Sequence, residues 1–229
     1  MSRPEVVAGT SDLAGVLSRE AAARLGSMTS AVRAEPHRIA DLFPAAAREV
    51  ARGPADPADP RGLLAPTLDD AVRGALLDAY ADATEGEEDV RLREVVALYR
   101  YGDADEKRAV LRALHRLRLG AGALPLVHDA LRTNDTRLVA AALGPYAAEH
   151  LDPEAWRQGV LKCLFVGVPV AAVAGLDRRA DADLHRMATA YAEERRAAGR
   201  DVPPDVHTVL AASATASAPD ASATPWEEN

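Results

Sequence analysis

Apolar residues recur at helical spacing along most of this chain, and no stretch alternates apolar and polar residues for long enough to predict a strand. Alanine is abundant and aromatic residues make up only 4% of the composition, so the side chains available for packing are small. Small side chains suit closely packed helices, whereas a β-sandwich needs more β-branched and aromatic residues. With 48% hydrophobic residues, the sequence predicts an all-α protein with a substantial core.

Capping residues, prolines and glycines divide this pattern into segments. Ser11 predicts the start of a helix that runs to about Ser27, and Pro36 and Pro44 predict a start or kink within a second helix near 29–52. The three prolines and two glycines of residues 53–62 predict a loop. Capping residues predict three further helix starts: Thr67, with Asp69 and Asp70 in the first turn, Asp103, and Asp152, with Pro153 at the first helical position. The apolar spacing predicts other helices over 87–101, 122–133, 135–150, 180–200 and 204–210.

The helix predicted after Asp103 has an apolar stripe on one side and basic residues on the other. The basic residues are Lys107, Arg108 and Arg112. A basic face of this kind is more often solvated than a binding patch, so we expect these three side chains to lie in water.

The length of 229 residues suffices for one domain with extended ends. We expect a flexible N-terminus over residues 1–10, a single helical domain over 11–210, and a disordered tail over 211–229, where the composition is of low complexity. Short helices joined by brief turns are typical of stacked antiparallel helices of HEAT-like type, an α-α superhelix. A Val followed four residues later by Leu recurs along the chain without a fixed period, which any amphipathic helix can produce by chance.

Charge and cysteine content exclude several classes of protein. The net charge of −8 argues against general nucleic-acid binding. The one cysteine, Cys163, excludes an internal disulfide framework and a multi-cysteine zinc site, and its apolar neighbours favour a buried, inert thiol. The first residues lack the apolar region of a secretory signal, so we expect a cytoplasmic protein.

The most apolar part of the chain is GVLKCLFVGVPVAAVAGLDRR, residues 159–179. Its uncharged run is shorter than the roughly 20 residues that span a bilayer, and Pro169 interrupts it. We therefore expect no membrane span, but a buried helix, a turn marked by the proline and a short apolar element.

No recognisable catalytic motif is present, neither a phosphate-binding glycine loop nor H-E-x-x-H, G-x-S-x-G or C-x-x-C. The six histidines do not pair at helical spacing. His150 has Asp152 and Glu154 nearby, but acids at a helix start are ordinary capping residues, so we expect neither a metal site nor a cofactor.

Three groups of polar residues are candidates for a ligand site, each with a structural alternative. Asn134 and Asp135 separate two helices, where they either cap a helix or contact a ligand. Lys162 shares a helix line with Gln158 and Phe165, and either extends to water or points into a cavity with an anionic partner. Asp177 either caps the helix over 180–200 or pairs with a neighbour, whereas with Arg178 and Arg179 it could form an arginine fork for a carboxylate or phosphate.

Several short motifs occur in a fixed order in the C-terminal half of the chain: Asn134-Asp135-Thr136, Pro145-Tyr146, Val160-Leu161-Lys162 with Phe165, Gly167 and Pro169, and Gly175-Leu176-Asp177-Arg178-Arg179. Through these motifs residues 134–204 resemble the EboA family, and the resemblance extends well over 100–204 and loosely over the N-terminal half. The chain differs from the family's usual pattern at Gly144 and Arg157, where asparagine is common.

The resemblance implies membership of a bacterial gene-cluster system that makes or exports a small metabolite. It implies companion proteins that resemble a TatD-like hydrolase, a UbiA-like prenyltransferase, a dehydroquinate-synthase-like enzyme and a sugar-isomerase-like protein. It implies no settled reaction.

Two functional hypotheses remain. The first is a helical binding or scaffolding module for a pathway intermediate or a partner enzyme, because stacked helices commonly present a groove and no catalytic set is recognisable. The alternative is a cofactor-independent enzyme acting on an anionic or polar intermediate, with its polar residues around one cavity. The residues of that cavity would be Tyr146, His150, Lys162, Arg178 and Arg179.

Overall fold

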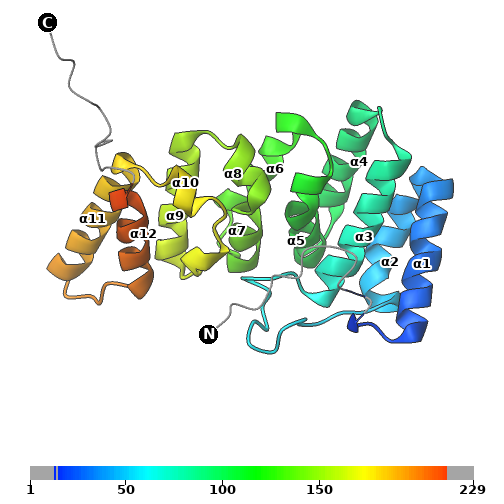
Figure 1. Cartoon of the computed structure of the whole chain (residues 1–229), viewed down its shortest axis with the longest axis horizontal. Helices are drawn as coiled ribbons and strands as arrows, with labels where there is room; N and C mark the ends of the chain where they lie inside the picture. The colour runs from blue at the N-terminus through cyan, green and yellow to red at the C-terminus, as the bar shows by residue number, and fades with distance from the viewer. Residues whose placement is uncertain (1–12, 14, 216–229) are drawn as a thin grey trace, which may run out of the picture. The chain divides into compact units, whose positions relative to one another are not determined.

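The computed structural model of the protein describes Leu13 and residues 15–215. All regular structure in this range is helical and none of it is a strand, which confirms the all-α prediction (Figure 1). The α-helices are α1 (Arg19–Ala34), α2 (Ile39–Glu49), α3 (Leu68–Ala83), α4 (Glu88–Tyr101), α5 (Ala104–Ala113), α6 (Leu124–Arg132), α7 (Thr136–Ala142), α8 (Pro145–His150), α9 (Pro153–Val166), α10 (Leu176–Arg179), α11 (Ala182–Ala197) and α12 (Pro204–Thr215). Short 3₁₀ helices occur at η2 (Pro36–Arg38), η3 (Leu114–Arg116), η4 (Gly120–Ala123) and η5 (Val170–Ala172).

The chain forms two compact units, where the sequence predicted one helical domain over 11–210. The first, unit 1, ends at Ala174, and the second, unit 2, begins at Gly175. The flexible N-terminus expected over 1–10 lies outside the described residues. So does most of the tail expected over 211–229, although α12 extends into that segment as far as Thr215.

In unit 1 the odd-numbered helices α1, α3, α5, α7 and α9 pack against one another in chain order (Figure 1). The even-numbered helices α2, α4 and α6 each pack against the next odd-numbered helix, and α2 also contacts α4 as α6 contacts α8. Two rows of helices therefore enclose the core of unit 1, and the largest fully buried side chains include Phe43, Leu76 and Trp156. The HEAT-like repeat remains a prediction.

Local capping explains where most of these helices begin. Thr67 and Asp103 cap α3 and α5 in reciprocal capping boxes with Asp70 and Glu106, and Asp152 caps α9, as predicted. The helix start predicted at Ser11 lies outside the described residues. Helix α1 begins after Ser18, whose hydroxyl accepts a hydrogen bond from the backbone N–H of Ala21 at 3.2 Å.

The apolar run over 159–179 divides between the two units. Its first part is the C-terminal half of α9, in which Cys163 is fully buried, as predicted. The helix ends at Gly167, which has φ +74°, and Pro169 precedes η5. Across the described range no helix combines the length and the apolar character needed to cross a bilayer.

Unit 2 contains α10, α11 and α12, with α12 packed against the other two. Asp181 caps α11 by accepting a hydrogen bond from the backbone N–H of Leu184 at 2.9 Å, so the capping role considered for Asp177 is wrong. The Nδ1 atom of His185 lies 3.0 Å from the hydroxyl of Ser213, which joins α11 to α12.

We expected the basic residues of α5 to lie in water, and this prediction is wrong for Arg108 and largely wrong for Arg112. The side chain of Arg108 is 4% exposed and that of Arg112 is 16% exposed. Helical periodicity placed both residues opposite the apolar stripe of α5. However, α5 packs against α3, α4 and α7, and the first turn of α3 and the loop before it cover the side that carries Arg108 and Arg112.

Candidate functional site

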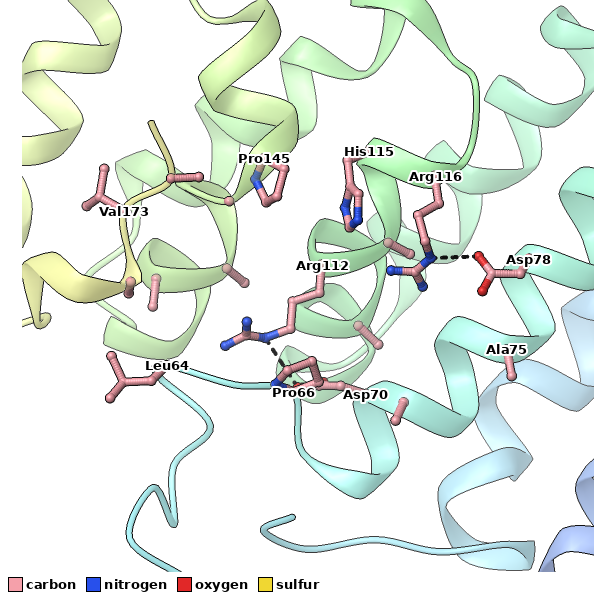
Figure 2. Close-up of a pocket in the computed structure, with 18 of the residues that line it drawn as sticks. Leu64, Pro66, Asp70, Ala75, Asp78, Arg112, His115, Arg116, Pro145 and Val173 are labelled. Carbon is pink, nitrogen blue, oxygen red and sulfur yellow. Dashed lines mark hydrogen bonds and ion pairs between the residues drawn. The ribbon is translucent and has the colours of Figure 1, made fainter. Parts of the chain in front are cut away.

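A cavity of about 310 Å³ lies within unit 1, where α3, α5 and α7 meet the loop that precedes α3 and the segment that follows η5 (Figure 2). Its volume is at the lower end of the range for small-molecule sites. The cavity is lined by Leu64, Pro66, Asp70, Ala71, Ala75, Asp78, Ala109, Arg112, Ala113, His115, Arg116, Ala140, Ala141, Gly144, Pro145 and Ala171 to Ala174.

Alanine is the commonest residue in the cavity wall, and its short side chain explains why the cavity exists. Pairs of alanines face the cavity from α3, α5 and α7, and others come from the segment after α9. An alanine side chain ends at Cβ, so helices at ordinary packing distances leave space that a leucine would fill. Some of the alanines that are abundant in the composition therefore line this cavity, and their short side chains create it.

Two connections hold the remaining walls in place. Asp59 accepts hydrogen bonds from the backbone N–H groups of Leu63, Leu64 and Ala65 at 2.9, 2.7 and 3.0 Å, which orders the loop before α3. Burial by itself raises the pKa of Asp59, but these hydrogen bonds outweigh it and lower that pKa. On the other side, the N–H of Ala174 donates to the carbonyl oxygen of Leu143 at 2.9 Å.

Arg112 is the most buried basic side chain that lines the cavity, and it projects from α5 toward the cavity (Figure 2). Its Nη2 donates to the carbonyl oxygens of Gly62 and Leu63, and its Nε lies 3.5 Å from Oδ2 of Asp70 without a hydrogen bond. No hydrogen-bond partner for Nη1 occurs within the described part of the chain. Burial lowers the pKa of Arg112, and Asp70 opposes this only in part.

Asp70 is held mainly by a different arginine. Nε of Arg108 donates to both carboxylate oxygens of Asp70, at 2.8 and 2.9 Å. The Nη2 atom of Arg108 also donates to Asp69 at 2.9 Å and to the hydroxyl of Thr67 at 3.0 Å. Burial raises the pKa of Asp70, and the charges of Arg108 and Arg112 oppose this only in part, so its pKa stays above the ordinary value.

Arg116 and His115 line the cavity from η3, beyond the end of α5. Nε of Arg116 donates to Asp78 at 2.9 Å, and its Nη2 lies over Gly74 of α3, where a Cβ atom would come within 2.9 Å. Burial lowers the pKa of His115, so at neutral pH its imidazole is uncharged. The cavity thus combines alanine walls with two arginines, two carboxylates and one neutral histidine.

None of the candidate residues named from the sequence lines this cavity. Tyr146 has a structural position: its hydroxyl donates to the carbonyl oxygen of Gly120 at 2.7 Å and accepts from the N–H of Ala123 at 3.1 Å. The ring of Tyr146 lies 4.6 Å from that of His150, measured between centroids.

A second, open groove of about 550 Å³ contains three of the other candidates, Asn134, Gln158 and Lys162, together with Phe165. The ammonium of Lys162 donates to the carbonyl oxygen of Leu131 at 2.6 Å, near the end of α6. A cation at the C-terminus of a helix is a stabilising arrangement.

The remaining candidates lie elsewhere. Asp135 caps α7 by accepting from the N–H of Arg137 at 2.9 Å, and its other oxygen pairs with the Arg137 guanidinium at 2.8 Å. Asp177, Arg178 and Arg179 form most of α10 in unit 2. The structure therefore brings together Asn134, Gln158 and Lys162, and separately Tyr146 and His150.

The sequence did not predict the cavity, because many of its lining residues are alanines and because Arg112 belongs to a helix face that we expected in water. One signal was present: Arg108, Arg112 and Arg116 recur at intervals of four residues, and Asp69 and Asp70 stand at the start of an adjacent helix. In the described range no group of three or more His, Cys, Asp or Glu side chains is placed to hold a metal ion.

Comparison with known proteins gives one match. No curated protein and no solved structure matches the chain. A family model described as metabolite traffic protein EboA matches residues 65–211, more than half of the chain, and this range contains all but Leu64 of the residues that line the cavity. The chain therefore belongs to the EboA family.

Proposed function

We propose that this protein is an accessory protein of a small-metabolite pathway and that it binds a pathway intermediate in the cavity between α3, α5 and α7. The family's description names metabolite traffic, which fits such a role. The observation that carries the proposal is the cavity itself, an alanine-walled space with charged groups at fixed positions inside a packed stack of helices.

The volume of the cavity limits the size of the intermediate, or of the part of it that is enclosed. At about 30 Å³ for each non-hydrogen atom, 310 Å³ holds about ten such atoms. The proposed ligand is thus small, or it inserts one end and leaves the rest outside.

The contacts of the lining residues favour binding over catalysis. Both carboxylates that line the cavity are engaged by arginines, Asp70 by Arg108 and Asp78 by Arg116. A carboxylate that accepts from an arginine has part of its accepting capacity occupied, which argues against a role as the general base. The cavity also holds no Ser, Thr or Cys to act as a nucleophile.

The alternative of a cofactor-independent enzyme rests on one residue of the cavity, His115. Its lowered pKa leaves the imidazole unprotonated at neutral pH, which is the form that accepts a proton. The experiment below separates the two functions.

We test the proposal by purifying the protein from cells that carry the whole gene cluster and analysing the small molecules released on denaturation by mass spectrometry. The test variant is Ala71→Leu, which places a larger side chain in the cavity from α3. The matched control is Ala23→Leu, the same change at an exposed position of α1.

We expect the wild type and Ala23→Leu to carry the same compound, and Ala71→Leu to lose most of it while keeping its thermal unfolding midpoint within a few degrees. Equal amounts of compound in all three proteins would place the binding site outside the cavity. Conversion of the compound by purified wild type but not by His115→Gln would favour the enzyme over the binding protein.

We further propose that the protein works in the cytoplasm together with the companion enzymes implied by the family, the TatD-like hydrolase, UbiA-like prenyltransferase, dehydroquinate-synthase-like enzyme and sugar-isomerase-like protein. Family membership alone supports this part of the proposal. Co-purification followed by identification of bound proteins tests it, and the absence of all four would count against a scaffolding role.

A further inference from the structure

The charge of Arg112 is incompletely balanced by its surroundings. The guanidinium is buried at the cavity, and a buried cation is costly unless it is paired and hydrogen-bonded. Two carbonyl oxygens accept from its Nη2, but carbonyl groups carry no net charge. Nη1 has no hydrogen-bond partner among the residues that the structure describes.

The two carboxylates that act on Arg112, Asp70 and Asp59, are both engaged by other groups, Asp59 by the backbone N–H groups of Leu63 to Ala65. Both oxygens of Asp70 accept from Nε of Arg108 at 2.8 and 2.9 Å, whereas Nε of Arg112 stays 3.5 Å away. A separation of 3.5 Å exceeds the ordinary range for an N–H···O hydrogen bond. The lowered pKa of Arg112, which arises from burial, agrees with a cation that lacks a full counter-charge.

A second guanidinium lies on the same side of the cavity. Arg116 follows Arg112 by four residues, which places the two side chains on one face, about one helical turn apart (Figure 2). Its Nε is bound to Asp78, while Nη1 and Nη2 make no hydrogen bond within the described residues. Each arginine of the cavity therefore keeps guanidinium nitrogens that no described residue engages, Nη1 in Arg112 and both Nη atoms in Arg116.

Apart from Asp70, Asp78 and His115, the remainder of the wall is apolar. Val173 lies across the cavity from Arg112 (Figure 2), and Leu64, Pro66 and alanines of α3, α5 and α7 also line it. Such a surface binds hydrocarbon and gives nothing to a second polar group at that end.

We infer that the ligand of this cavity has a small apolar body and one anionic group, a carboxylate or a phosphate, which Arg112 and Arg116 bind together. This inference rests on the proposed function and adds the chemical class of the ligand. The anion accepts hydrogen bonds from Nη1 of Arg112 and from the Nη atoms of Arg116, and the apolar body lies along the alanine walls.

Three probes of similar chain length test this by isothermal titration calorimetry of the full-length protein: octanoate, octyl phosphate and 1-octanol. Each has about ten non-hydrogen atoms or a few more, which matches the cavity. Hydrogen bonds between charged groups are stronger than those to a neutral hydroxyl, so we expect at least one of the two anions to bind more tightly than 1-octanol, by about tenfold or more. The tighter of the two identifies the anionic group as carboxylate or phosphate.

Single substitutions locate the effect. In Arg112→Met, and separately in Arg116→Met, we expect the preference for the anion over 1-octanol to fall toward unity, with little change in the affinity for 1-octanol. The matched control is Arg100→Met, which removes the same charge from α4, where Arg100 stacks on Tyr101 at 6.0 Å. This control should keep the preference.

The outcomes separate the inference from the proposed function. Equal affinities of the wild type for 1-octanol and both anions would overturn the anionic ligand but leave the binding cavity. Failure of all three probes to bind would count against the cavity and so against the proposed function as well. If Arg112→Met does not fold, the wild-type comparison and Arg116→Met still decide the question.

Discussion

Arg108 and Asp70 form a buried ion pair in which Nε of the arginine lies 2.8 Å from Oδ1 and 2.9 Å from Oδ2 of the carboxylate. The two side chains are 4% and 1% exposed, and they join the middle of α5 to the first turn of α3. The same carboxylate accepts the backbone N–H of Thr67 at 3.1 Å as part of the capping box. The pair therefore joins α5 to α3, and its carboxylate, that of Asp70, also takes part in the capping box of α3 and lines the cavity.

Removing one member of this pair should destabilise the protein strongly. We expect Arg108→Met to lower the free energy of unfolding by about 3–5 kcal/mol, because Asp70 is then left charged and buried without its partner. Urea denaturation followed by circular dichroism measures the change. Arg118→Met is the control, since Arg118 pairs with Asp82 and Glu85 at the surface, and we expect a change below about 1 kcal/mol. Similar losses in the two variants would contradict the role given to the buried pair.

The Asp135–Arg137 pair should make a pH-dependent contribution to stability. Hydrogen bonds from Arg137 hold the pKa of Asp135 below its ordinary value of 3.8. A carboxyl whose pKa is lower in the folded state stabilises the protein above pH 3.8, and this stabilisation is lost as the pH falls through the folded value.

We therefore expect the stability difference between wild type and Asp135→Asn to be largest near neutral pH and to shrink below pH 3.8. Urea unfolding curves at pH values between 6 and 3 measure it. Arg137→Met should remove the same pH-dependent component, because it removes the group that lowers the pKa. A difference that stays constant with pH would show that Asp135 acts only as an uncharged cap.

Two glycines inside helices should respond in opposite directions to the same substitution. A Cβ on Gly159 of α9 would come within 2.7 Å of Cδ2 of Leu143, a fully buried side chain. Around Gly26 of α1 nothing lies within 4 Å of that position. Alanine favours a helix over glycine by about 1 kcal/mol, whereas overpacking a core costs roughly 1–3 kcal/mol.

We thus expect Gly26→Ala to raise the free energy of unfolding by about 0.5–1 kcal/mol and Gly159→Ala to lower it, by up to about 2 kcal/mol. Chemical denaturation of the two variants beside the wild type measures both. Stabilisation by Gly159→Ala would mean that Leu143 moves aside without cost.

The hydroxyl of Tyr146 should be needed for stability and not for ligand binding. Tyr146→Phe removes a donor to Gly120 and an acceptor for the N–H of Ala123, and leaves both backbone groups without that partner. A buried polar group that loses its partner costs about 1–3 kcal/mol, so we expect a loss in that range. Thermal unfolding measures the loss, and titration with the probes of the cavity should give affinities equal to those of the wild type. Weaker binding in this variant would restore Tyr146 as a site residue.

Local chemistry determines most of the helices of this protein. Thr67, Asp103 and Asp152 cap their helices with hydrogen bonds to residues two or three positions away, so the sequence alone predicts these starts. The all-α class and the burial of Cys163 follow from the apolar periodicity in the same way. The cap of α1 by Ser18 was not predicted from the sequence.

Only the tertiary structure decides which polar residues form a site. Arg108 and Arg112 are charged residues on the polar side of α5, and the periodicity of this helix alone predicts that both side chains are exposed to solvent. They are buried because Asp70 and the loop around Gly62, some 40 to 50 positions away in the chain, cover that side and supply their hydrogen bonds. The cavity depends likewise on alanines from three helices, since a short side chain produces a hollow only when the opposing side chains are short as well.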